Sequence, residues 1–190
     1  MQDQSGNSNN GNNRGSAAQR PSTVALGAEP CNTAPANSLP GGTVRILRTG
    51  IDSLYLSYPG TLTTETAIRL DKLKEFAQAD NPAQVALAQY PAGDHLFEVR
   101  DRGSCLFAYV LVDHWYRINV ASKKAKALPL AIAQIASELL TLQGPRPAES
   151  VLRSIVDTLG QVAGVPRVSR ADLCVDFVTD YPLHLIRDED

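Results

Sequence analysis

The strongest constraint on the fold is an amphipathic pattern near residue 150. Apolar residues recur there at the spacing of one helix face, with prolines before them and a glycine after them: Pro145, Pro147, Val151, Leu152, Ile155, Val156, Leu159 and Gly160. Proline suits the first turn of a helix and glycine suits its end. The pattern therefore predicts a helix over 145–160 whose buried stripe packs against a sheet.

The segment before this helix predicts several strands and a second helix. Residues 50–58 alternate between apolar and polar side chains and end at Pro59-Gly60, which is typical of a strand with one buried face. A helix is predicted from about Thr64 to Asp80. Short apolar or alternating runs joined by turn residues then predict a meander over 96–100, 106–112 and 115–120.

Two later segments complete the predicted sheet. The apolar run over 130–140 fits a helix or a strand, and its place after the meander favours a strand. Residues 167–178 predict the final strand. The order of elements indicates an α+β fold, in which two helices pack on one face of a twisted, largely antiparallel sheet.

The amino-terminal residues differ in composition from the rest. Residues 1–42 are rich in Asn, Ser, Gly, Gln, Ala and Pro, which cannot bury enough apolar surface to offset the entropy lost on ordering. We expect a disordered tail over 1–42 and one α+β domain over 43–190. The sequence has no apolar run near the roughly 20 residues of a membrane span and no signal-peptide pattern, so we expect a cytoplasmic protein without a membrane partner.

The final strand carries the residues most suited to chemistry. Alternation places Ala171, Leu173, Val175 and Phe177 in one row, expected in the core, and Arg170, Asp172, Cys174 and Asp176 in the other. We expect the two aspartates about 7 Å apart, close enough to share a divalent cation. In the alternative, this face is solvated and Arg170 pairs with Asp172.

The segment Arg170-x-Asp172-Leu173-x-x-Asp176 resembles one in rolling-circle replication initiation proteins of plasmids and filamentous phages. Residues 50–57 are similar to the opening strand of the same family. The resemblance implies an origin-binding DNA nickase, in which a divalent metal (Mg or Mn) polarises the scissile phosphate and a tyrosine attacks phosphorus.

Transferred to this sequence, the resemblance makes Asp172 and Asp176 candidate metal ligands and Arg170 a phosphate or carboxylate partner. Glu138 would complete the site if its strand lies beside the final one. Tyr181 is the one tyrosine after Asp176 and a weak candidate nucleophile, so we expect that these residues are the amino-terminal part of a longer initiator. The expected partner is single-stranded or hairpin origin DNA.

The charge balance of the sequence does not identify a DNA-binding surface. The formal net charge is -2, whereas DNA binding needs clustered Lys and Arg. Candidate clusters occur at two places in the sequence: Lys123, Lys124 and Lys126, and Arg100 and Arg102. The alternatives to a nickase are a non-enzymatic DNA-binding or protein-interaction module and a truncated remnant of a mobile element.

Overall fold

The computed structural model describes residues 44–179. Tyr181 and the expected tail over 1–42 lie outside this range. The described elements are β1 (Val44–Tyr58), β2 (Gly60–Leu62), α1 (Thr64–Ala77), α2 (Pro82–Val85), β3 (Gln89–Ala92), β4 (His95–Val99), β5 (Tyr109–Val112), β6 (Tyr116–Val120), β7 (Ala131–Ile135), α3 (Ser137–Gln143), α4 (Pro145–Leu159), β8 (Gly160–Val162) and β9 (Arg167–Thr179).

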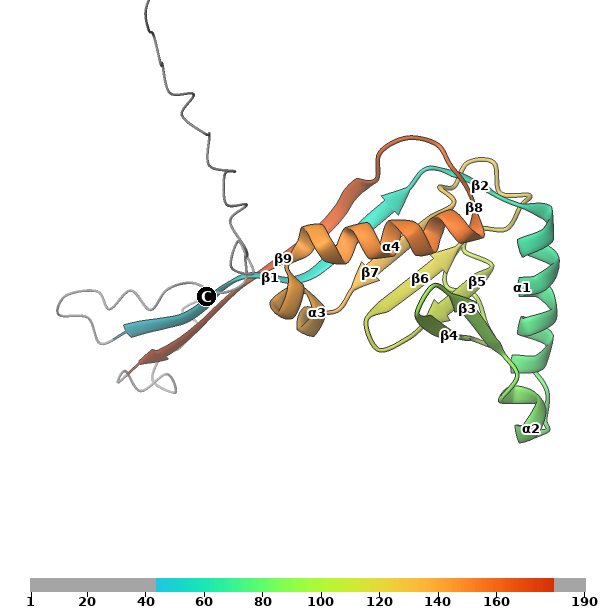
Figure 1. The fold of residues 1–190 in the computed structure, drawn as a ribbon, viewed down its shortest axis with the longest axis horizontal. Helices are drawn as coiled ribbons and strands as arrows, with labels where there is room; N and C mark the ends of the chain where they lie inside the picture. Colours follow the sequence, from blue (N-terminus) through green and yellow to red (C-terminus); the bar gives the residue numbers. More distant parts are fainter. Residues whose placement is uncertain (1–43, 180–190) are drawn as a thin grey trace, which may run out of the picture.

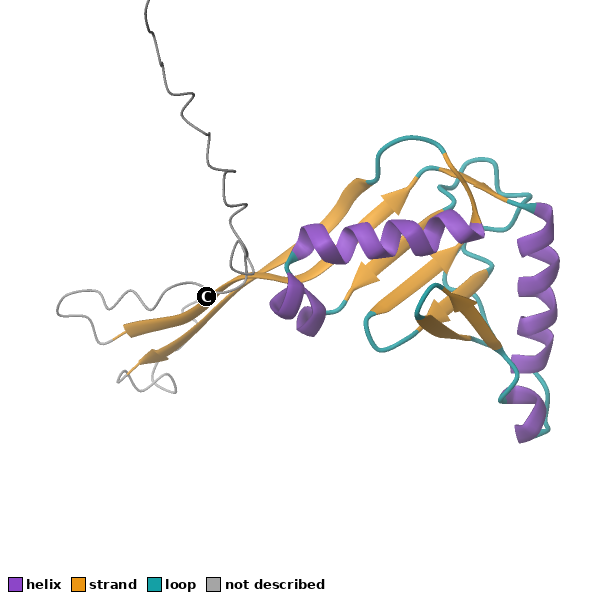
Figure 2. Ribbon diagram, in the orientation of Figure 1, coloured by secondary structure: helices purple, strands orange, loops and turns teal. Residues whose placement is uncertain are grey.

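The predicted α+β class is confirmed. A seven-stranded sheet has the order β3-β4-β5-β6-β7-β1-β9, and each neighbouring pair is antiparallel. The short strands β2 and β8 form a separate antiparallel pair. In Figures 1 and 2, α4 crosses the sheet and α1 stands beside the β3 and β4 end. None of the described helices has the length and apolar content needed to cross a membrane.

Within residues 44–179, α1, α3 and α4 cover one face of the sheet, and of the helices only α2 borders the other, which we call the open face. Alternate residues of three central strands are buried, and these residues point to the face on which α1, α3 and α4 pack: Leu54, Leu56 and Tyr58 on β1, Tyr116, Ile118 and Val120 on β6, and Ala131, Ala133 and Ile135 on β7. Within these three strands, the intervening residues point the other way and are exposed or half-buried. On β5, Val110 points to the same second face, opposite Asn119, and is buried. The intervening side chains of the three central strands are therefore available to a ligand on the open face.

Four buried tyrosines attach the helices to the sheet through their hydroxyl groups. Tyr116 donates to the carbonyl of Ala148 at 3.0 Å, and Tyr109 donates to Oδ1 of Asp71 at 2.6 Å. Longer bonds of the same kind join Tyr58 to Glu149 and Tyr90 to Thr158. Burial raises the pKa of Tyr116 to about 12, with Asp113 adding to the effect. Burial also raises the pKa values of Tyr58 and Tyr109.

These tyrosines predict unfolding at alkaline pH. A folded-state pKa above the unfolded value near 10 adds stability below pH 10 that is lost as pH rises through the folded value. For Tyr116, a difference of about 2 units corresponds to roughly 3 kcal/mol. We expect the free energy of unfolding, measured by urea titration with Trp115 fluorescence, to fall steeply above pH 10. The fall should be smaller in Tyr116→Phe, and an equal fall in that variant would contradict the assignment.

Two predictions about the later elements need correction. The run over 130–140 is a strand only as far as Ile135, because α3 begins at Ser137. Leu139 and Leu140 extend the apolar run, but they are buried from a helix against the core. The prediction that Leu173, Val175 and Phe177 lie in the core is wrong, because their exposed fractions are 80%, 55% and 46%.

The exposure of β9 follows from its position in the sheet. β7 pairs with β1 only from Leu54 onward, so the preceding residues of β1 have β9 as their strand partner. We call the paired segments Val44–Ser53 and Asp172–Thr179 the β1–β9 ribbon. Figure 1 shows this ribbon projecting beyond α3 and α4. The apolar row therefore lies on a two-stranded extension that the helices do not cover.

Candidate nucleic-acid interface

Asp172, the first expected metal ligand, is held by two polar neighbours. Its Oδ1 accepts a hydrogen bond from Nε of Arg170 at 2.8 Å, and its Oδ2 accepts one from Oγ of Ser53 at 2.6 Å. These bonds, with that from Arg170 the stronger, hold the pKa of Asp172 below its ordinary value. Asp172 is thus a charged carboxylate with donors on both oxygens, and the alternative of an Arg170–Asp172 pair is confirmed.

Asp176, the second expected ligand, is paired with Arg48 on the opposite strand. Nε of Arg48 lies 2.8 Å from Oδ2 of Asp176, and its Nη1 donates to Oγ1 of Thr141 at 2.7 Å. Asp52 lies 3.7 Å from the same guanidinium and accepts a hydrogen bond from Ser137 at 2.8 Å. Arg48 therefore supplies the positive charge expected beside Asp176 and joins the β1–β9 ribbon to α3.

The two aspartates do not fit a site that holds one cation between them. The expected 7 Å separation is wrong, because four residues of extended strand span about 13 Å. Glu138 was expected to complete the site if its strand lay beside the final strand. It lies exposed on α3 instead, and β1 separates β7 from β9, so Glu138 does not join the two aspartates in this way. Within residues 44–179, no three His, Cys, Asp or Glu side chains are grouped to hold a metal ion. The Mg or Mn hypothesis stays a prediction.

A different set of residues comes together on the open face. Opposite residues of paired strands point to the same side, and the register places one residue from every strand of the large sheet in a line: Gln89, Glu98, Val112, Arg117, Gln134, Tyr55 and Arg170. We call this line the open-face row. At about 4.8 Å per strand, the row is roughly 29 Å long.

One end of the open-face row combines an aromatic ring with cationic and amide groups. The guanidinium of Arg170 lies 5.3 Å from the ring centroid of Tyr55. Gln134 separates Tyr55 from Arg117, which is exposed. Among the described residues, Arg117 has no ion-pair or hydrogen-bond partner for its side chain, and neither has Arg167, which is exposed near the start of β9. These two guanidinium groups are available to an anion.

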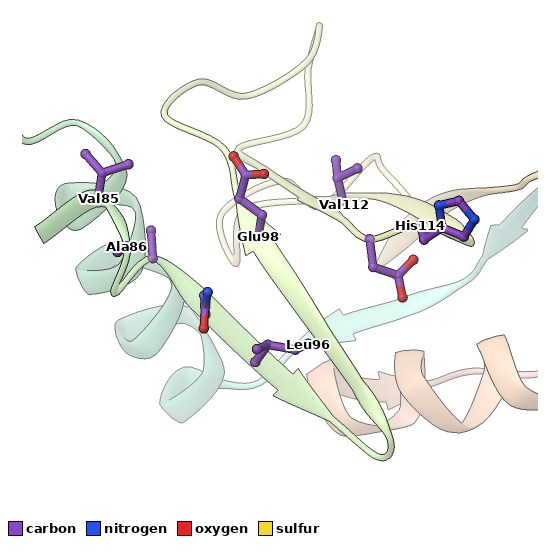
Figure 3. Close-up of a pocket in the computed structure, with 9 residues that line it drawn as sticks. Val85, Ala86, Leu96, Glu98, Val112 and His114 are labelled. Atoms are coloured by element: carbon purple, nitrogen blue, oxygen red, sulfur yellow. The ribbon is translucent and has the colours of Figure 1, made fainter. Parts of the chain in front are cut away.

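Hollows in the surface follow the rest of the open-face row. A pocket of about 430 Å³ lies against Gln89, Glu98 and Val112, and Val85 and Ala86 line it as well. Figure 3 shows Glu98 and Val112 among the lining side chains. A second pocket of about 140 Å³ continues from Val112 to Arg117 and Gln134. Both pockets are lined by Asp113 and His114 as well. The row thus lies along a discontinuous groove that crosses the strands.

A half-buried pair, His95 and Asp113, lies beside the middle of this groove, and Asp113 lines both pockets. Nδ1 of His95 lies 2.5 Å from Oδ2 of Asp113, while Oδ1 of Asp113 accepts hydrogen bonds from the backbone N–H groups of Trp115 and Tyr116 at 2.8 and 2.6 Å. Asp113 therefore fixes the turn between β5 and β6. Tyr116 is buried and bonded to α4, and Trp115 packs against the core.

The other predicted basic residues do not join the open-face row. Arg100 pairs with Glu98 at 2.9 Å and Arg102 pairs with Asp101 at 3.6 Å, so neighbouring carboxylates offset both charges. Three lysines lie exposed in the loop between β6 and β7, where Lys123 donates to Oγ1 of Thr64: Lys123, Lys124 and Lys126. The loop lies at the end of the sheet opposite the β1–β9 ribbon.

The fold and this face define an α+β domain with a one-sided sheet and an aromatic and cationic row across its open side. The chain matches no protein-family model, no curated protein and no solved structure. The function of the chain is therefore inferred from its own residues.

Sequence reasoning found one end of the open-face row and missed the rest. Arg170 was identified from its motif, but Tyr55, Gln134 and Arg117 were not. Their alternation with buried residues is visible in the sequence and marks each as outward-facing. Their alignment depends on the strand order β6-β7-β1-β9, which no local pattern records.

Proposed function

We propose that the chain binds single-stranded DNA across the open face of its sheet. The observation that carries this proposal is the alignment of Arg170, Tyr55, Gln134 and Arg117 in one row. A tyrosine ring offers a surface on which a base stacks, and arginine attracts the backbone phosphates. Gln134 adds a donor and an acceptor for a base edge.

The charge balance of the face supports this proposal despite the net charge of -2. Glu98, which belongs to the row, and Asp172, two residues from Arg170, are each paired with an arginine. Arg117 and Arg167 have no such partner among residues 44–179. A strand of nucleic acid on this face would therefore meet two uncompensated positive charges.

The motif resemblance favours DNA, and origin DNA in particular, as the nucleic acid. Arg170 belongs both to the segment that resembles rolling-circle initiators and to the open-face row. In this proposal, the α+β domain binds the origin, and nicking belongs to the complete initiator. The ion pairs of Asp172 with Arg170 and of Asp176 with Arg48 agree with this division, because an arginine already offsets the charge of each carboxylate without a metal ion.

Binding of a fluorescent DNA oligonucleotide, followed by anisotropy at several salt concentrations, tests the proposal. Tyr55→Ala should weaken binding roughly 5- to 150-fold, because a stacked base contributes about 1–3 kcal/mol. Arg117→Ala should reduce the salt dependence by about 0.7 of a counterion. Arg102→Ala is the matched control, since Asp101 offsets its charge.

Three outcomes separate the alternatives. Equal affinities for the wild type, Tyr55→Ala and Arg102→Ala would place any DNA binding outside the open face and contradict the proposal. Tighter binding to a matched RNA oligonucleotide would overturn the choice of DNA. Cleavage of the labelled strand after addition of Mn²⁺ would show nicking by this chain alone, and its loss in Asp172→Asn would support the predicted metal site.

A further inference from the structure

The outer edge of β9 has no strand partner within the described residues. β9 is the last strand of the large sheet, and its pairing is with β1. Between Arg170 and Asp176, the backbone N–H and C=O groups that point away from β1 can therefore pair with another strand. Proteins usually protect such an edge with proline or charge. β9 has no proline, and although its charged residues occupy one face, the apolar row on its other face is exposed.

We propose that β9 pairs with β9 of a second copy of the chain, antiparallel about a two-fold axis at Leu173. This inference concerns a different surface from the open face and does not depend on DNA binding. The argument for a second copy is the complementarity of the strand with itself in this register. In a symmetric antiparallel pair, each contact occurs twice, so both apolar and charged matches count double.

The apolar residues match in this register. Leu173 lies opposite the partner's Leu173, and Ala171 lies opposite the partner's Val175. Leu173 is 80% exposed and Val175 is 55% exposed, so both have surface to bury. Directly opposite side chains lie about 4.5–5.5 Å apart and contact one another. The apolar row that the helices leave uncovered thus becomes continuous across two chains.

The charged residues match in the same register. Arg170 lies opposite the partner's Asp176, and the partner's Arg170 lies opposite Asp176. Each of these groups already has an ion pair within its own chain, Arg170 with Asp172 and Asp176 with Arg48, so the register sets opposite charges beside these pairs and adds no like-charge contact. Asp172 lies opposite the partner's Cys174, so no carboxylate faces another. The seven residues from Arg170 to Asp176 contain no irregularity on β9, whose pairing with β1 shifts at Ser169.

The neighbouring registers give up charged or apolar matches. Centring the pair on Val175 sets Leu173 against the partner's Phe177, but it no longer sets Arg170 against the partner's Asp176. Centring the pair on Asp172 sets that carboxylate against its own copy, and centring it on Cys174 sets Asp172 against the partner's Asp176. Like charges directly opposite are destabilising. A shift of one residue in the pairing sets the apolar row against the charged row. Centring on Ala171 sets Leu173 against the partner's Ser169, at the irregularity.

The oligomeric state of the full chain tests the inference first. Light scattering after size exclusion should show a mass approaching twice 20.4 kDa at high concentration. Leu173→Lys should return the mass to that of the monomer, since it sets two ammonium groups against each other at the axis. Leu106→Lys in the loop between β4 and β5 is the matched control, because Leu106 is 76% exposed and β5 lies four strands away from β9, and it should remain dimeric.

Disulfide trapping tests the register. In a background of Cys31→Ser, Cys105→Ser and Cys174→Ser, Leu173→Cys should form a covalent dimer on mild oxidation, because directly opposite Cα atoms lie within disulfide range. Ala171→Cys should not, since its opposite residue is the partner's Val175. A monomeric mass at all concentrations would overturn the proposal, whatever the reason that β9 does not pair. Equal trapping of both variants would overturn the register.

Discussion

Gly60→Ala is expected to destabilise the protein by roughly 4 kcal/mol or more, because it adds a steric clash to backbone strain. A β-carbon at Gly60 would lie 2.2 Å from the carbonyl oxygen of Gln161. The φ angle of Gly60 is +150°, which an L side chain rarely adopts. The contact is between backbones of β2 and β8, so no side chain can rotate away to relieve it.

The clash matters because the β2–β8 pair connects the ends of two helices. β2 leads into α1 through Thr63, whose side chain caps that helix, and β8 follows α4 directly. The N–H of Thr63 donates to the carbonyl of Leu159 at 3.4 Å. Separation of β2 from β8 would therefore release the relative positions of α1 and α4 on the sheet.

Substitutions at two further glycines separate the steric clash from the backbone strain as causes of the destabilisation. Gly160→Ala brings a β-carbon to 2.3 Å from the carbonyl oxygen of Thr61, but Gly160 has ordinary extended backbone, so this variant tests the clash alone. Gly93→Ala tests strain alone, because its φ is +58° and nothing lies within 4 Å. We expect a cost of about 1 kcal/mol for Gly93→Ala. Urea unfolding that gives Gly60→Ala a cost as small as Gly93→Ala would contradict the packing of β2 on β8.

The sequence was most informative where a pattern has one physical interpretation. The helix over 145–160 was predicted almost to its ends, because helical spacing, proline at the start and glycine at the end agree. β3 was not predicted, since Pro91 lies within it. Proline is tolerated there because β3 is an edge strand, and an edge position is a property of the assembled sheet.

The final strand shows where local pattern stops being sufficient. Alternation divided β9 correctly into an apolar and a charged row, but alternation does not say which row is covered. That depends on how far the helices reach along the sheet, and α4 ends short of the ribbon. The hydrogen-bond partner that Asp172 has on β1 could not be predicted from local pattern either, because Ser53 is 119 residues away from Asp172 in the sequence.

The second large effect is expected for Leu152→Ala, which should cost about 2–5 kcal/mol. Leu152 on α4 is fully buried among the residues of the main core. Its truncation would remove apolar contacts and leave a cavity between α4 and the sheet. Val151→Ala is the matched control from the same helix turn, because Val151 is 40% exposed, and its cost should be well below that of Leu152→Ala.

Urea unfolding of both variants also tests the basis of the functional proposal. Tyr55 and Arg117 are assigned to the open face because their neighbours Leu54, Leu56, Tyr116 and Ile118 are buried on the opposite face, in the same core as Leu152 of α4. A large cost for Leu152→Ala with a small cost for Val151→Ala requires α4 to pack through that side. Equal losses in the free energy of unfolding would mean that α4 does not cover the face that carries Leu54 and Leu56. The assignment of Tyr55 and Arg117 to the accessible face would then fail.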